Sequence, residues 1–165
     1  MIKLDTLKTM NEEERLKYML ILLKGQLSSE NDPLANLSNA SGIIKACIDR
    51  INWAGFYILR GDNLVLGPFQ GLPACNRIEI GKGVCGSAIK DMKTILVDDV
   101  NLFEGHIACD SASKSEIVIP IILGGIPFGV LDIDSPEKRR FTSLEKDYLE
   151  KFVEILNKYI KWDRV

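Results

Sequence analysis

The chain has 165 residues, of which 46% are hydrophobic and 27% are charged, and its formal net charge is -2. This length fits one domain, residues 1–165, that buries about two-thirds of the surface of its unfolded chain. A charge so close to zero gives no electrostatic basis for binding nucleic acid or an anionic membrane. The first residues lack the apolar core of a signal peptide, and the longest apolar run, residues 117–131, contains prolines and glycines. The sequence therefore predicts a cytoplasmic protein without a membrane span.

Two helices are expected in the first part of the chain. Residues 11–27 carry apolar side chains at helical spacing and acidic residues in the first turn. The stretch "SSENDP" ends this helix, and the apolar stripe of a second helix spans residues 34–48. Cys47 lies on that stripe, so we interpret it as a small core residue without a chemical role.

From residue 52 onward, short apolar runs alternate with turn signals, which is typical of β-structure. Residues 53–60 and 64–71 predict one hairpin, and residues 115–123 and 128–134 predict another across Gly124 and Gly125. Further strands are expected over residues 75–80 and 94–97. Between them, "GKGVCGSAIK" predicts a short helix whose glycines match neither phosphate-binding fingerprint and instead allow a tight turn.

The last helix is expected to begin after Thr142, which has capping-box spacing to Glu145, and an apolar stripe follows as far as Tyr159. Helices at both ends of the chain thus bracket an antiparallel sheet. This order of elements predicts an α+β domain.

Three cysteines lie beside turn residues rather than among apolar ones. Cys109 lies with His106 in a long connection, residues 98–114, and loops of this length are uncommon unless they are functional or disordered. Cys75 and Cys85 would allow an attacking thiol to meet a resolving thiol. Zinc bound by all four residues is less favoured because no Cys-x-x-Cys motif is present, so we expect no metal and no cofactor. An exposed cysteine without a role also stays open.

Acidic residues replace apolar ones at the end of the last predicted strand. Asp132 and Asp134 alternate with Leu131 and Ile133, which places both carboxylates on the face of Phe128 and Val130. Such a pair repels unless a cation lies between its members or one member is protonated.

Glu116 joins these carboxylates only in one register of the second hairpin. A three-residue turn between the strands places it opposite Asp134, whereas a two-residue turn places it on the wrong face. The alternative for all three acids is a solvated strand end.

Trp53 and Tyr57 share one face of the first strand, with Gly55 between them. Two aromatic walls around a glycine predict a slot for a small ligand, with ordinary core packing as the alternative. Taken with the acids and thiols, this pattern favours a pocket in which carboxylates hold an ammonium group or share a proton. Its aromatic faces suit a thioether or methyl group.

The segments "NWAGFY", "LGPFQGLPAC", "GKGVCG", "HIACDSASKSEIVIPI" and "GVLDIDSP" resemble the free methionine-R-sulfoxide reductases, a family of small stand-alone GAF-domain enzymes. The resemblance covers almost the whole chain. It implies a GAF-like fold in which the N- and C-terminal helices pack on one side of a central antiparallel sheet. Loops then cover a pocket on the other side.

The resemblance also implies roles for individual residues. Cys109 is the expected nucleophile, Cys75 the principal resolving cysteine and Cys85 a further redox-active one. The expected substrate-binding residues are Trp53, Tyr57, Glu116, Asp132 and Asp134. A homodimer and recycling by thioredoxin are implied as well.

In the mechanism implied by the resemblance, the Cys109 thiolate attacks the sulfoxide sulfur and becomes a sulfenic acid. Cys75 then condenses with it to a disulfide.

Two other classes of protein stay open. A GAF-type binding module would keep ligand binding without turnover, and a thiol redox sensor would be oxidised by peroxide without any sulfoxide substrate.

Overall fold

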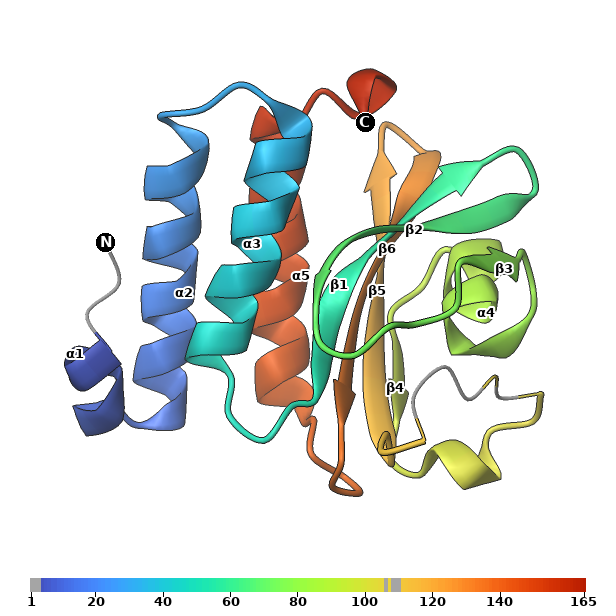
Figure 1. Cartoon of the computed structure of the whole chain (residues 1–165), viewed down its shortest axis with the longest axis horizontal. Coiled ribbons are helices and arrows are strands. Elements are labelled where there is room, and N and C mark those ends of the chain that lie inside the picture. The colour runs from blue at the N-terminus through green and yellow to red at the C-terminus, as the bar shows by residue number, and fades with distance from the viewer. Residues whose placement is uncertain (1–3, 106, 108–110) are drawn as a thin grey trace.

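The computed structural model describes residues 4–105, 107 and 111–165. A six-stranded sheet separates the helices α2, α3 and α5 on one side from α4 and several loops on the other (Figure 1). The helices are α1 (Leu4–Thr9), α2 (Glu12–Leu27), α3 (Pro33–Cys47), α4 (Gly83–Asp91) and α5 (Ser143–Tyr159), with 3₁₀ turns η1 (Val100–Leu102) and η2 (Trp162–Arg164). The strands are β1 (Trp53–Arg60), β2 (Asn63–Gln70), β3 (Arg77–Glu79), β4 (Ile95–Val97), β5 (Ser115–Leu123) and β6 (Ile126–Ser135).

The strands lie in the order β3-β2-β1-β6-β5-β4, and each neighbouring pair is antiparallel. This arrangement confirms the predicted α+β class and the predicted packing of the terminal helices on one side of the sheet. Within the described ranges, no helix combines the length and the apolar character needed to cross a membrane.

The long helices begin where their capping residues place them. Asn11 caps α2 in a reciprocal capping box with Glu14, and Asp32 accepts a hydrogen bond from the first turn of α3. The predicted box between Thr142 and Glu145 is present at the start of α5. These caps satisfy backbone N–H groups that have no partner within the helix.

The alternation of side chains along β1 divides the interior into two cores. Ala54, Phe56 and Ile58 pack against the long helices in the larger core. Trp53 and Tyr57 point to the opposite face and pack in a smaller core beneath α4. The side chains that carry chemistry lie at the edge of this smaller core, so the helix-covered face acts as their scaffold.

Cys47 lies in the larger core with 1% of its surface exposed, which confirms its interpretation as a core residue. Burial raises the pKa of its thiol to about 11, despite a smaller opposing effect of Arg15, and the thiol is free. A cysteine in this setting is unreactive at neutral pH.

The strand predicted over residues 75–80 is shorter in the structure. Only β3, residues 77–79, pairs with β2, so Cys75 lies in the preceding loop rather than in a strand. The helix α1 and the turns η1 and η2 were not predicted, because segments so short carry too few apolar positions to show a helical period.

Candidate active site

A pocket opens on the sheet face opposite the long helices. Strands β1, β5 and β6 form its floor, and α4 with the neighbouring loops forms its walls. The lining residues are Trp53, Tyr57, Ala74, Ile78, Gly83, Val84, Cys85, Ile107, Ser113, Glu116, Asp132 and Asp134. Its mixed lining of apolar, aromatic and acidic side chains is that of a site for a small molecule.

The three predicted carboxylates converge on this pocket. Glu116 on β5 lies directly opposite Asp134 on β6, and Asp132 lies two residues earlier on β6. Trp53 on β1 is also paired with Asp134, and Gly55 is paired with Asp132. The expected cluster of acids beside the aromatic strand is therefore present.

The route to this register differs from the prediction. Only Gly124 and Gly125 separate the strands, since Leu123 pairs with Ile126, so the turn has two residues rather than three. A bulge in β6 supplies the missing residue. The pairing steps from Ile122 opposite Pro127 to Ile121 opposite Gly129, which leaves Phe128 as the additional residue.

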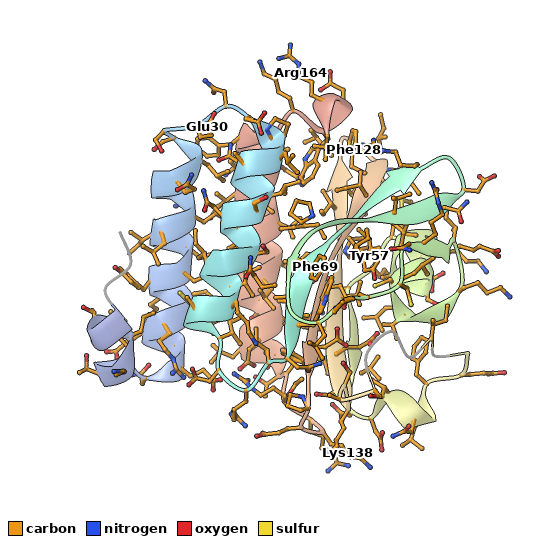
Figure 2. All side chains as sticks on the ribbon, in the orientation of Figure 1. Glu30, Tyr57, Phe69, Phe128, Lys138 and Arg164 are labelled. Atoms are coloured by element: carbon orange, nitrogen blue, oxygen red, sulfur yellow. The ribbon has the colours of Figure 1, made fainter. Side chains whose placement is uncertain are left out.

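The same bulge corrects the predicted face of Phe128. Its side chain packs with the larger, helix-side core and stacks on Trp162 with ring centroids 6.2 Å apart. Val130 lies in the smaller core on the pocket side. Figure 2 shows Phe128 near the C-terminal end of the chain and Tyr57 lower on the sheet. The bulge thus interrupts the alternation of side chains, so that Phe128 and Val130 lie on opposite faces of the sheet.

Asp132 is a strongly perturbed acid of the pocket. Burial raises the pKa of its carboxyl well above the usual range, and the neighbouring Glu116 raises it further. Hydrogen bonds from the Cys85 thiol and from the backbone of Ile133 oppose these effects only in part. One oxygen, Oδ1, is buried without a hydrogen-bond partner in the described part of the chain. Asp132 is thus suited to hold a proton at neutral pH.

Cys85 lies in the first turn of α4 and lines the pocket beside Asp132. Its thiol is free and only 5% exposed. Burial raises the pKa of this thiol well above the usual range, and the charges of Asp132, Glu116 and Asp134 raise it further. Because the thiolate is the reactive form, Cys85 in this state is a hydrogen-bonding thiol rather than an activated nucleophile.

The aromatic side of the pocket is more filled than the sequence suggested. Trp53 stacks on Tyr57 with ring centroids 5.9 Å apart, and on Phe69 at 5.3 Å. A Cβ atom on Gly55 would lie 2.3 Å from the Cβ of Phe69 and 2.7 Å from Cη2 of Trp53. The predicted slot at Gly55 is therefore wrong: the protein's own side chains occupy it, and the pocket lies beside it.

Cys75 does not line the pocket, but its neighbour Ala74 does. It lies half-buried in the loop between β2 and β3 and is disulfide-bonded. Tyr57 Oη donates a hydrogen bond of 3.0 Å to its carbonyl oxygen. The predicted nucleophile Cys109 and the single histidine, His106, lie outside the described residues. In the ranges that are described, no cluster of three or more potential ligands is placed to hold a metal ion.

Several lining residues were not predicted as functional. Ala74 and Val84 are sequence neighbours of Cys75 and Cys85, and that adjacency is the signal that would have found them. Ile78 and Ile107 contribute apolar surface, but single isoleucines are indistinguishable from core residues in a sequence. Ser113 is held by Asn52, whose Nδ2 donates to its hydroxyl over 3.0 Å.

Comparisons with known proteins agree with this architecture. The family model of the GAF domain matches residues 34–160. The free methionine-R-sulfoxide reductase of Saccharomyces cerevisiae is 45% identical over 157 residues, covering 90% of this chain and 87% of the yeast protein. The enzyme of the same name from Escherichia coli is 47% identical over 134 residues, covering 81% of each chain.

A solved structure extends the similarity to three dimensions. The X-ray structure of free methionine-R-sulfoxide reductase from Neisseria meningitidis in complex with its substrate matches with a TM-score of 0.90 at 37% identity. The match covers 94% of this chain and 94% of the Neisseria chain. The similarity therefore includes the whole fold and is not confined to local motifs.

Proposed function

This chain belongs to the GAF domain family and, within it, to the free methionine-R-sulfoxide reductases, and we propose on this basis that it reduces free L-methionine-R-sulfoxide to methionine. The observation that carries the proposal is the convergence of Glu116, Asp132 and Asp134 with Trp53 and Tyr57 on one pocket. Carboxylates and aromatic faces are the groups that an amino acid with a methyl sulfoxide requires.

The reducing step is assigned to Cys109. Its thiolate attacks the sulfoxide sulfur while an acid protonates the oxygen, which is otherwise a poor leaving group. The protonated oxygen then passes from the methionine sulfur to the Cys109 sulfur: the sulfoxide S–O bond and the S–S bond formed by the attack break, and a new S–O bond forms on Cys109. The sulfoxide is reduced to methionine, which leaves, and Cys109 is oxidised to a sulfenic acid. We assign the acid role to Asp132, which is supported by its buried position and raised pKa.

Recognition of the free amino acid is assigned to the carboxylate nearer solvent. Asp134 is half-buried, whereas Asp132 and Glu116 are buried. An ionised Asp134 would hold the substrate's ammonium group, which a methionine sulfoxide within a peptide lacks. This difference would explain selection for the free amino acid.

Recycling is assigned to Cys75. Its thiol attacks the sulfenic acid, a disulfide forms and water leaves. The pairing with Cys109 is supported by the disulfide-bonded state of Cys75 and by the free thiols of Cys47 and Cys85. Cys85 keeps a secondary redox role, because its raised pKa disfavours the thiolate.

The external reductant in this proposal is a dithiol protein of the thioredoxin type, acting in the cytoplasm, where such reductants keep thiols reduced. The homodimer implied by the resemblance is checked by light scattering on the purified chain. Neither point affects the chemistry assigned above.

The test is consumption of free L-methionine-R-sulfoxide, compared with the S epimer and a peptide-bound sulfoxide, with thioredoxin and its reductase present. Turnover confined to the free R form supports the proposal. Cys109→Ser should abolish that turnover and keep substrate binding, whereas Cys47→Ala, matched for loss of one thiol, should keep it. Absence of turnover in fully reduced wild-type protein would refute the proposal and favour a binding or sensing domain.

A further inference from the structure

The loop that carries Cys75 is held by the polar edges of the two pocket aromatics. Tyr57 Oη donates to the carbonyl oxygen of Cys75 over 3.0 Å, and Trp53 Nε1 donates to the carbonyl oxygen of Leu72 over 3.2 Å. Both aromatic side chains are at most 2% exposed. A buried hydroxyl or indole N–H without a partner is destabilising, so each donor favours the one loop position that offers it a carbonyl.

Packing along the start of the loop reinforces these hydrogen bonds. Phe69, near the end of β2, stacks on Trp53 at an interplanar angle of 15°. At Gly71 the chain passes so close that a Cβ atom would lie 2.4 Å from Cδ1 of Trp53 and 3.0 Å from the carbonyl oxygen of Asn52. Only glycine fits there, so β1 fixes the path of the chain from Phe69 to Cys75.

We infer that Tyr57 and Trp53 are positioning residues for the resolving step, because both side chains line the pocket while their polar groups hold the loop that carries Cys75. The inference rests on the proposed function, in which Cys75 condenses with a sulfenic acid on Cys109. In that step the Cys75 sulfur attacks the Cys109 sulfur, the S–S bond forms and the S–O bond breaks. The hydroxyl leaves as water with the thiol proton.

The position of Cys75 determines the rate of this step. An intramolecular attack gains its speed from the effective concentration of the attacking group, which falls when the group samples other positions. Tyr57 therefore links two functions, since a single ring contributes to the substrate pocket and its hydroxyl holds the residue that acts after the substrate has left.

The test bypasses substrate binding. Fully reduced protein receives one equivalent of hydrogen peroxide, which oxidises the reactive thiol to a sulfenic acid. The rate of disulfide formation is then followed by loss of free thiol. Dimedone present in a parallel sample captures sulfenic acid that has not been resolved, and mass spectrometry locates the adduct.

Tyr57→Phe keeps the ring and removes the donor. We expect disulfide formation about two- to tenfold slower, the range set by loss of one neutral hydrogen bond, with more dimedone adduct on Cys109. Tyr148→Phe is the matched control, because it removes a hydroxyl that donates to exposed Glu13, far from the loop in sequence. Gly71→Ala leaves both donors in place but displaces the loop, and it should give the same change as Tyr57→Phe.

The outcomes separate the two proposals. Wild-type rates and adduct levels in Tyr57→Phe would overturn the positioning inference alone. A wild-type protein that forms no disulfide with peroxide would overturn it together with the proposed resolving chemistry. Failure of the proposed function would instead appear as absence of sulfoxide turnover in wild-type protein, which the peroxide experiment does not measure.

Discussion

Glu116 lies directly opposite Asp134 although the two strands that carry them are joined by a two-residue turn. A regular hairpin with this turn would place Glu116 on the opposite face of the sheet from Asp134. The bulge at Phe128 adds one residue to β6 and restores the carboxylate cluster. The pocket therefore depends on a backbone irregularity only three residues beyond the turn, at Phe128 and next to Gly129.

Gly129 should be intolerant of any side chain. A Cβ atom there would lie 2.2 Å from the carbonyl oxygen of Tyr57 on the neighbouring strand, so the backbone must shift. We expect Gly129→Ala to lower the free energy of unfolding by about 1–3 kcal/mol, as overpacking does, and to reduce sulfoxide turnover more than stability alone explains. Urea denaturation and the turnover assay measure the two effects.

Gly25→Ala is the matched control for that substitution. Gly25 lies inside α2, and a Cβ atom there would meet nothing within 4 Å. This change should stabilise the protein by about 0.5–1 kcal/mol, because alanine favours a helix over glycine. Equal tolerance of alanine at the two positions would show that the bulge does not require glycine.

The sequence predicted most of what periodicity and capping determine. The long helices, both hairpins and the buried position of Cys47 follow from apolar spacing, and the Thr142–Glu145 box marks the start of α5. The acids were found because charged residues at inward positions break the strand pattern. These signals are local, so they need no knowledge of the neighbouring strands.

The remaining features depend on contacts between strands. Gly129 beside Phe128 is compatible with a bulge, because a glycine inside a strand often marks one. The alternation rule treats residues 128–134 as a regular strand, so the side chain of Phe128 was assigned to the wrong face. Phe69 on β2 fills the slot at Gly55, and the residue pattern of β1 alone gives no indication of this contact. The hydrogen bond between Tyr57 and Cys75 joins residues from different elements and was likewise not predictable.

Asp132 should make the protein less stable as the pH rises. Its pKa is raised in the folded state by burial and by Glu116, so above about pH 4 the folded state binds more protons than the unfolded state. Stability is then greatest below the unfolded pKa and decreases toward the folded pKa. Asp132→Asn removes this dependence. As the pH rises, the free energy of unfolding of the variant should therefore increase relative to that of wild type, by up to about 1.4 kcal/mol per pH unit.

Urea midpoints from about pH 4 to about pH 8 test this expectation. Asp147→Asn, an exposed change on α5, is the control and should parallel the wild type. Sulfoxide turnover by Asp132→Asn should fall by about 10²- to 10⁴-fold, the usual contribution of a general acid. Parallel stability curves for Asp132→Asn and wild type would contradict the raised pKa.

Glu145 should have the opposite pH dependence. Burial raises the pKa of its carboxyl, but hydrogen bonds from Thr142 and Arg140 outweigh burial and lower it to about 2. The stabilisation is complete above the unfolded pKa, about 4.3, and is lost as the pH falls toward 2. Glu145→Gln should lower the free energy of unfolding by up to about 3 kcal/mol at neutral pH. This difference from wild type should become smaller in acid. Glu154→Gln, exposed on the same helix, should show no such narrowing in urea denaturation.

Cys85 should act mainly through its hydrogen bond to Asp132, and two substitutions separate this role from a redox role. Cys85→Ser keeps a donor, so its turnover and pH profile should stay close to those of wild type. Cys85→Ala removes a hydrogen bond that lowers the pKa of Asp132. Asp132 then stays protonated to higher pH, and the alkaline limb of the kcat/KM profile should shift to higher pH. If both variants lose turnover equally and neither profile moves, Cys85 is instead needed for thiol exchange, as the family resemblance implies.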